Sequence, residues 1–328
     1  MPSVVSRLRS GGVSGFIVRR LLLGILVLVL VSIVVFLATQ ALPGDPALAI
    51  LGRSATPQSL AALRKLLHLD RPVIDQYWTW VIGLLHGNLG ISLAAQEPVS
   101  TLLGPKLVNS GVLVAISAVV SIPLSVAIGS WAALKRDKVF DTLSSNLLLV
   151  LAALPEFVVA VVLVILLATT LFNVFPAIST IPPGARPWDN FSGLVLPCLT
   201  LVIAVAPYVA RIMRASMIEV LESDYVEMAR LKGLPERTIL VRHALPNALG
   251  PVFQVIALNL AYLAGGIVVV EFVFAYSGIG SALQEAVVNH DLPVVQALAM
   301  LIAAVYVVLN LLADVATILV TPRLRTRL

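Results

Sequence analysis

The apolar residues of this chain are gathered into six long runs, which polar segments separate. A helix needs about 20 consecutive, mostly apolar residues to cross the hydrocarbon core of a bilayer, and each run meets that length. The pattern therefore predicts an all-α integral membrane protein with six transmembrane helices. We place these helices at residues 21–44, 107–134, 142–172, 191–212, 248–272 and 293–320. The first run does not end like a signal peptide, so we expect it to remain as an anchor.

Composition supports the membrane class. Of the 328 residues, 59% are hydrophobic and 12% are charged, and the mean hydropathy is +1.01. Soluble domains usually carry about 25% charged residues, so an ordinary soluble domain is excluded. The one cysteine, Cys198, lies inside an apolar run and has no partner for an internal disulfide. We expect it to be a small buried hydrophobic residue.

Orientation follows from the distribution of Lys and Arg. With six spans and both termini on one side, that side holds 16 of the 22 Lys and Arg residues. Cationic connections stay in the cytoplasm, so we expect both termini to be cytoplasmic. The basic leader at residues 1–20 and the tail at 321–328 then lie inside, whereas residues 45–106 and 273–292 lie outside.

The external region at residues 45–106 is too long for a simple connection. Thr56 is a suitable N-cap and Pro57 a suitable first residue for a helix there. Tyr77, Trp78 and Trp80 form an aromatic group of the kind that suits a membrane surface. We expect this region to pack as a cap on the outer end of the protein.

The polar segment at residues 216–247, which we call the knuckle, separates two apolar runs and is predicted to be cytoplasmic. Asp224 is a suitable N-cap, and Glu227 three residues later can complete a capping box. Gly233 can adopt the left-handed backbone that ends a helix. The pattern therefore predicts a short helix over residues 225–232.

A second short helix is predicted after the glycine turn of the knuckle. Pro235 permits a helix to begin at Glu236, and Pro246 is expected to interrupt it after about Ala244. The small Ala229 of the first helix would allow a partner to approach closely. We therefore expect a rigid projection from the membrane.

The knuckle also carries a resemblance to a known family. Its Glu227-Met228-Ala229, three residues, Gly233 and, after eleven more, Leu245-Pro246 resemble the EAA signature of bacterial ABC importer permeases. That signature reads E-A-A, three residues, G, nine residues, I, one residue, L-P. The spacing is kept, while Met228 stands in place of the first alanine and His243 in place of the isoleucine.

One branch of that family, the B-type dipeptide, oligopeptide and nickel permeases, is similar over nearly the whole chain. The matching stretches are Ser223-Asp224-Tyr225-Val226, Lys232-Gly233-Leu234, Arg242-His243-Ala244-Leu245, Pro43-Gly44-Asp45-Pro46, Leu69-Asp70-Arg71-Pro72, Gln76-Tyr77, Gly87-Asn88-Leu89-Gly90, Val269-Val270-Glu271 and Pro322-Arg323.

The resemblance implies a type I ABC importer permease fold, with a permease core over residues 107–320. It also implies that the short helix of the knuckle is a coupling helix seated in a groove of a cytoplasmic ATPase. The residues expected to serve this coupling are Asp224, Tyr225, Glu227, Ala229, Arg230, Gly233, Leu234, Leu245 and Pro246.

The same resemblance implies partners. These are a second, homologous permease, two cytoplasmic ATPase subunits and an extracytoplasmic substrate-binding protein, with a peptide as substrate, in the lipid bilayer of a bacterial inner membrane and with no nucleic acid. ATP and Mg would be bound by the ATPase, and we expect no cofactor in this chain. None of its lysines precedes Ser or Thr, so the sequence lacks the G-x-x-x-x-G-K-[ST] phosphate loop. We therefore expect a non-catalytic subunit.

Three acidic residues lie in the apolar runs, where charge is costly and marks a polar cavity or an ion pair. Glu156, beside Pro155, is a candidate for the transport pathway, where it would meet the amino group of a peptide. Pairing with another subunit is an equal alternative. Glu271 and Asp314 lie near the ends of spans, where we expect hydration.

Other charged residues receive simpler interpretations. Arg211 and Arg214 are expected to reach lipid headgroups from the inner end of the fourth span. His290 and Asp291 are expected to form a solvated external turn.

Other functions remain open at this stage. The same machine could import nickel, glutathione, haem or an oligosaccharide. A secondary transporter driven by an ion gradient would use Glu156 or Asp314 as its proton site, and a third alternative is a purely structural membrane subunit. Binding of an ATPase distinguishes the importer from the other two classes.

Overall fold

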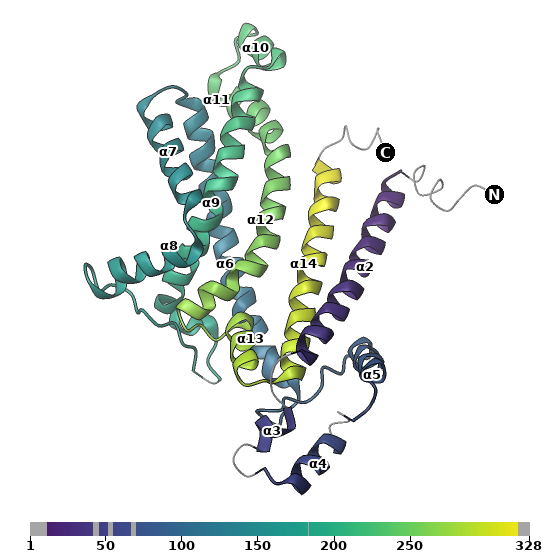
Figure 1. Cartoon of the computed structure of the whole chain (residues 1–328). Helices are drawn as coiled ribbons and strands as arrows, with labels where there is room; N and C mark the ends of the chain where they lie inside the picture. Colours follow the sequence, from purple (N-terminus) through teal and green to yellow (C-terminus); the bar gives the residue numbers. More distant parts are fainter. Residues whose placement is uncertain (1–11, 42–45, 52–54, 67–69, 183, 321–328) are drawn as a thin grey trace, which may run out of the picture.

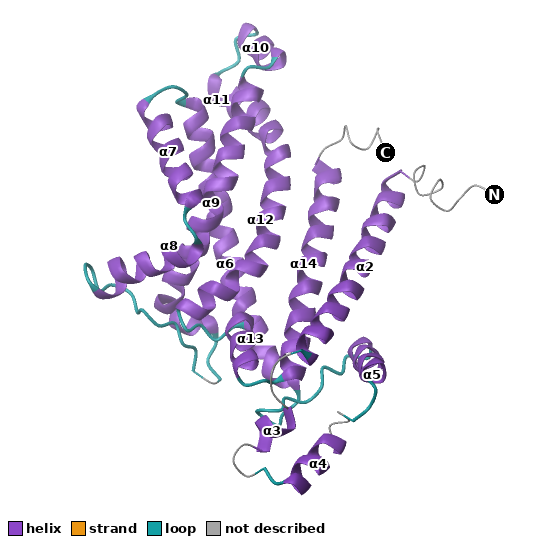
Figure 2. Cartoon of the chain, viewed as in Figure 1, coloured by secondary structure: helices purple, strands orange, loops and turns teal. Residues whose placement is uncertain are grey.

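The structure is a computed structural model, and it describes residues 12–41, 46–51, 55–66, 70–182 and 184–320. Across these ranges the chain is helical and has no strand, apart from one isolated bridge between two residues (Figure 2). The α-helices are α2 (Gly12–Gln40), α3 (Pro46–Leu51), α4 (Pro57–Leu66), α5 (Val73–Leu85), α6 (Val99–Leu134), α7 (Val139–Ala153), α8 (Glu156–Leu163), α9 (Phe191–Leu221), α10 (Asp224–Leu231), α11 (Glu236–Thr238), α12 (Leu245–Val273), α13 (Ile279–Val288) and α14 (Leu292–Val320). A 3-10 helix, η3 (Pro187–Asn190), precedes α9, and two π-helices follow α8 and α11: η2 (Val164–Thr169) and η4 (Ile239–Ala244). The predicted all-α class is confirmed.

The long helices run side by side with α9 at the centre. Helix α9 packs against α6 and α12, α12 also packs against α14, and α14 packs against α2 (Figure 1). Most of the apolar residues of α9 are buried, whereas most of those of α2 are exposed. Helix α9 therefore forms the core, and the apolar surface of α2 suits contact with lipid tails.

The number of spans depends on how the bent helices are counted. In the described ranges, four helices are long and apolar enough to cross a membrane. Two further pairs of helices meet the same test only when each bent pair is taken as one span. The six predicted spans correspond to this larger count.

The sharpest bend lies at Pro155, where a kink was predicted. Helix α7 ends at Ala153, and α8 leaves it at 107° (Figure 1). Leu154 has the extended backbone (φ −80°, ψ 130°) that a residue before proline prefers. The predicted helix at residues 142–172 is thus two helices.

Several helix ends differ from the predicted ones. Helix α2 begins at Gly12, inside the predicted leader, and α6 begins eight residues before its predicted start. Helix α9 extends nine residues beyond its predicted end at residue 212. Parts of four segments named in the sequence analysis lie outside the described residues. These are residues 1–11 of the basic leader, Pro43-Gly44-Asp45, Leu69 and the tail at 321–328.

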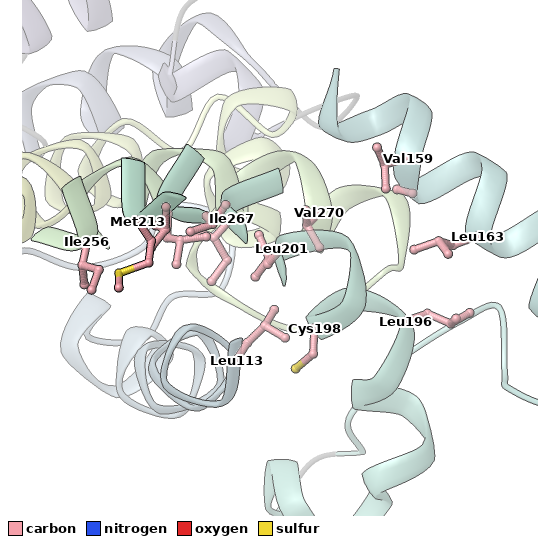
Figure 3. Packing of buried hydrophobic residues seen from close by; sticks show 14 of the residues in the cluster. Leu113, Val159, Leu163, Leu196, Cys198, Leu201, Met213, Ile256, Ile267 and Val270 are labelled. Atoms are coloured by element: carbon pink, nitrogen blue, oxygen red, sulfur yellow. The ribbon is translucent and has the colours of Figure 1, made fainter. Parts of the chain in front are cut away.

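The main core forms where α6, α8, α9 and α12 meet. Figure 3 shows Leu113, Leu163, Leu201 and Ile267, one from each of these helices, gathered in this region. Cys198 lies in the same cluster as a buried free thiol, so the prediction for it is confirmed.

The two ends of the bundle carry different structures. The first turn of α2 and the last turn of α14 lie at the end where α10 projects, and α3, α4, α5 and α13 lie at the opposite end (Figure 1). The positive-inside count assigns the α10 end to the cytoplasm.

Two ion pairs correct expectations from the sequence. Arg214 does not reach for headgroups: its Nε and Nη2 donate to the two carboxylate oxygens of buried Asp141 at 2.5 and 2.6 Å. Asp314 is paired as well as partly hydrated, because its carboxylate lies 3.1 Å from Arg20 Nε. These pairs join α7 to α9 and α2 to α14.

Candidate functional site

The knuckle begins where α9 ends. Helix α10 starts at Asp224, with Ser223 in the N-cap position, so the prediction of Asp224 as N-cap was wrong by one residue. The Ser223 hydroxyl donates to the Val220 carbonyl. Asp224 and Glu227 both lie in the first turn, where carboxylates favour the positive end of the helix dipole.

A glycine turn closes α10 as predicted. Gly233 has a φ of +75°, and its N–H donates to the Arg230 carbonyl at 2.9 Å. The Leu234 N–H donates to the Ala229 carbonyl at 3.3 Å. This pair of bonds is a Schellman motif. The Arg230 guanidinium also pairs with Glu236 at 2.9 Å, which fastens α10 to α11 across the turn.

The second part of the knuckle differs from the prediction. The chain stays helical from Glu236 through η4 and into α12, and Pro246 is in the first turn of α12 without interrupting the helix. A proline lacks an N–H and its ring crowds the carbonyl four residues earlier, here Arg242. The wider π-helical turn of η4 gives that carbonyl room.

Helix α10 has an inner and an outer face. Val226 and Ala229 are buried with Ile239 of η4 in a small apolar cluster. Ala229 therefore packs inside the knuckle, and its contact with a partner stays a prediction. The outer face exposes Tyr225, Met228 and Leu231, with Leu231 76% exposed.

The remaining predicted coupling residues lie on α10, in the glycine turn after it and at the start of α12. Asp224, Glu227, Arg230, Gly233, Leu234 and Pro246 are exposed, and Leu245 is half-buried against the main core. Met228 and Leu231 were not among the predicted residues. The signal that could have found them is their apolar character in a charged segment.

The base of the knuckle is fastened to the bundle. The Ser216 hydroxyl of α9 donates to the Ala248 carbonyl of α12 at 2.8 Å, and both residues are buried. Arg136, in the turn between α6 and α7, forms an ion pair with Glu222 at the end of α9. A displacement of α10 would therefore be carried into α9 and α12.

Glu156, the predicted pathway residue, is the first residue of α8. In the described part of the chain its Oε1 is buried without a hydrogen-bond partner. The carboxylate lies over Gly266 of α12, because a Cβ built on that glycine would be 2.7 and 2.8 Å from its oxygens. Tyr262, one turn earlier in α12, interacts with the same carboxylate.

The position of Glu156 is set by two breaks in the spans. It follows the 107° bend between α7 and α8, and α12 bends by 55° between Leu260 and Gly265. Irregular backbone at membrane depth is tolerated where it is buried in protein or lines a water-filled cavity. Glu156 thus lies where two bent spans meet.

Glu271 is not hydrated as predicted, because its side chain is fully buried. Its Oε1 accepts a hydrogen bond from the Ser110 hydroxyl of α6 at 2.5 Å. Its Oε2 accepts from the backbone N–H of Gly280 at 2.6 Å and of Ser281 at 3.3 Å. Every oxygen of this buried acid therefore has a donor.

Asp291 is also buried, which corrects the predicted solvated turn. Its carboxylate accepts from the Ser92 hydroxyl at 2.5 Å and from the N–H groups of Leu93 and Ala94 at 3.1 and 3.2 Å. This contact ties the turn before α6 to the start of α14. His290 beside it is half-buried.

The external aromatic group packs on the end of α2. Phe36 stacks on Trp80 at 5.8 Å between ring centroids and meets Tyr77 edge-on at 5.3 Å. The Tyr77 hydroxyl also bonds to Ser32 at 2.9 Å. Thr56 caps α4 as predicted, since its Oγ1 accepts from the Ser59 N–H at 3.2 Å.

The described residues form no group of three or more His, Cys, Asp or Glu side chains that could hold a metal ion.

Comparison with known families gives two matches that together cover most of the chain. Residues 125–326 match the family described as binding-protein-dependent transport system inner membrane component. Residues 13–125 match the N-terminal region described for the membrane components of the same transport systems.

Individual relatives are similar over nearly their whole length. A peptide ABC transporter permease protein of Sinorhizobium fredii is 36% identical, over 94% of this chain and 99% of its own length. A peptide transport system permease protein of Brucella abortus is 35% identical, over 95% and 99%. The glutathione transport system permease protein GsiC of Escherichia coli is 34% identical, over 94% and 98%.

Proposed function

The chain belongs to the family of binding-protein-dependent transport system inner membrane components, the permeases of ABC importers, and on that premise we propose that it forms half of the pathway of an ATP-driven peptide importer. It is a multi-pass protein of a bacterial inner membrane. Relatives named for peptides and for glutathione, itself a tripeptide, support di- and oligopeptides as the substrate class.

The proposal assigns the knuckle to a cytoplasmic ATPase. The observation that carries this assignment is the exposed apolar face of Tyr225, Met228 and Leu231 on a helix that projects beyond the bundle (Figure 1). An apolar helical face bordered by charges is what a groove on a partner protein recognises. The carboxylates of Asp224 and Glu227 and the guanidinium of Arg230 surround it.

Movement of the ATPase reaches the spans through the fastened base of the knuckle. The Schellman turn and the Arg230–Glu236 pair make α10, α11 and η4 one unit. That unit continues directly into α12 and is bonded to α9 through Ser216. A shift of α10 would therefore tilt the two innermost spans, which is how a rigid-body switch opens a pathway.

Glu156 is the proposed pathway residue. Its Oε1, which is buried without a donor among the described residues, supports this role, since the ammonium group of a peptide would supply a hydrogen bond to it. A cation from the second permease would supply this bond equally well. The ammonium group would be present only when peptide is bound, whereas a cation of the second permease would be present without peptide.

The other partners complete the proposed machine. A homologous second permease forms the other half of the pathway, two ATPase subunits bind ATP and Mg, and an extracytoplasmic binding protein delivers the peptide. This chain is then a non-catalytic subunit.

Two glycines allow a matched test of the coupling assignment. Gly233 in the knuckle and Gly184 in an external loop have φ values of +75° and +82°, and a Cβ on either would meet open space. Valine is strained at such a φ, so Gly233→Val and Gly184→Val carry the same local cost. We expect Gly233→Val to reduce co-purification with the ATPase and peptide uptake at least tenfold, and Gly184→Val to leave both near wild type.

Membrane content of both variants is measured by immunoblot as the control for insertion. ATP-driven uptake by Gly233→Val at the wild-type rate would contradict the coupling role of α10.

A further inference from the structure

The turn that joins α12 to α13 is held from inside the bundle. Helix α13 begins at Ile279 after Gly278, which has no side chain that could accept from the first N–H groups of the helix. The carboxylate of Glu271, which belongs to α12, accepts from the N–H groups of Gly280 and Ser281. The free N–H groups at a helix start are usually bonded by a side-chain oxygen of the N-cap residue, and a carboxylate is also favourable there because of the helix dipole. Here a neighbouring span supplies it.

Helix α6 holds the same turn through two consecutive residues. Ser110 Oγ donates to Glu271 and accepts from the Ile279 N–H at 2.9 Å. Asn109 Nδ2 donates to the Ser277 carbonyl at 2.7 Å. The buried Tyr276 hydroxyl donates to the Asn109 carbonyl at 2.8 Å. Three elements, α6, α12 and α13, therefore meet at one carboxylate.

The carboxylate also explains a small residue in the turn. A Cβ built on Gly278 would overlap the carboxylate of Glu271, and the three nearest atoms to it all belong to that side chain. The φ of Gly278 is −117°, which any residue adopts. Glycine is thus required at residue 278 by the space that Glu271 occupies and not by the backbone.

The position of Glu271 along α12 gives the contact a role in transport. Helix α12 begins at the knuckle and carries Glu271 near its other end, at the face of the bundle where α13 lies (Figure 1). We infer that Glu271 is a positioning residue: it caps α13 from α12 and bonds both to α6, so that a displacement of α12 by the knuckle moves α13 with it. This inference rests on the proposed function, in which the knuckle is displaced by an ATPase.

The first test measures the cap itself by hydrogen exchange of the assembled complex in lipid nanodiscs. Loss of hydrogen bonds to a charged acceptor opens a helix start, so Glu271→Ala should speed amide exchange in residues 279–288 about tenfold or more. Ser110→Ala should do so less, because it removes the acceptor of the Ile279 N–H while Glu271 still accepts from the N–H groups of Gly280 and Ser281. The matched control is Glu285→Gln, which changes an exposed acid on α13 itself and should leave exchange unchanged.

The second test uses the space that the carboxylate occupies. Gly278→Ala should speed exchange in α13 in the wild-type background, because its Cβ displaces the Glu271 carboxylate. In the Glu271→Ala background it should add nothing, because the overlapping atoms are gone. Additive effects would overturn the assignment of the cap to Glu271.

The third test separates positioning from folding. Glu271→Ala is expected to keep the ATPase bound and hydrolysing ATP, while peptide uptake per ATP falls about tenfold; Ser110→Ala should lower the same ratio by a smaller factor. If Glu271→Ala does not assemble, Ser110→Ala and Gly278→Ala decide the outcome. Wild-type uptake per ATP in all three variants would overturn the inference.

The proposed function and the cap on α13 can be disproved independently. A wild-type complex without ATP-driven uptake would overturn the proposed function, whereas the exchange measurements on α13 would still decide whether Glu271 forms the cap.

Discussion

Two acidic side chains that pack against or belong to α12 differ in their hydrogen bonding. Glu271 belongs to α12, is fully buried, and accepts hydrogen bonds from one hydroxyl and two backbone N–H groups. Glu156 comes from α8, lies over Gly266 of α12, and has a buried oxygen without a donor in the described structure. Both oxygens of the first acid have donors, whereas among the described residues one oxygen of the second has none.

This difference predicts a structural role for Glu271 and a role in transport for Glu156. Burying a charged group destabilises the fold by several kcal/mol unless hydrogen bonds or an opposite charge compensate. Removing those partners therefore destabilises the protein. Glu271 is bonded by residues of its own chain, so its loss should appear first in the structure. Glu156 has an oxygen without a donor among the described residues, at the place where two spans bend, so its loss should appear first in transport.

The largest expected effect is on stability and distinguishes the two acids directly. Glu271→Ala leaves the Ser110 hydroxyl and two backbone N–H groups buried without an acceptor, which should cost about 3 kcal/mol or more. Glu156→Ala removes an unsatisfied group and should cost less than about 1 kcal/mol. Thermal unfolding of the complex in detergent measures both. Equal losses of Tm would erase the distinction between the two acids.

An intermediate effect is expected at the glycine under Glu156. A Cβ on Gly266 would be 2.7 Å from a carboxylate oxygen, so Gly266→Ala should cost about 1–3 kcal/mol through overpacking. In the Glu156→Ala background the same substitution should be nearly neutral. Gly250→Ala, at a position of the same helix where a Cβ meets open space, serves as the control. A cost that persists without the carboxylate would show that Glu156 does not occupy this contact.

The smallest effect in energy is the one that tests the pathway. Glu156→Gln keeps the shape of the side chain and removes its charge, so Tm should stay near wild type while peptide uptake falls about fivefold, equivalent to about 1 kcal/mol. Uptake measured against peptide concentration tells the occupants apart. A raised KM indicates the ammonium group of the peptide, and a lowered maximal rate at constant KM indicates a cation of the second permease. Unchanged transport would return Glu156 to a packing role.

The sequence was sufficient for features that depend on local pattern. Long apolar runs identify spans because a bilayer demands about 20 such residues, and the turn at Gly233 was found because few residues accept a positive φ. The break at Pro155 followed from the missing N–H, although its 107° angle did not. The start of α4 was also predictable, because it depends only on the capping side chain of Thr56 and on Pro57 directly after it.

Features that depend on distant residues were missed. Ser110 and Glu271 are 161 residues apart, and Asp141 and Arg214 are 73 apart, so no local pattern connects them. Glu271 is near the end of an apolar run and was therefore expected to be hydrated, and Arg214 was expected to reach lipid headgroups. Tertiary packing instead pairs each with a residue distant in the sequence. The contact of Ala229 with Ile239 was not predicted for the same reason, since the two residues meet only in the folded knuckle.

The central claim is that this chain transports peptide by coupling to an ATPase. The most direct measurement is uptake of labelled dipeptide by proteoliposomes that contain both permeases, both ATPases and the binding protein, with ionophores present to abolish every ion gradient. We predict uptake that requires ATP, persists with the ionophores and is lost with Gly233→Val. Uptake driven by an imposed proton gradient without ATP would contradict the account.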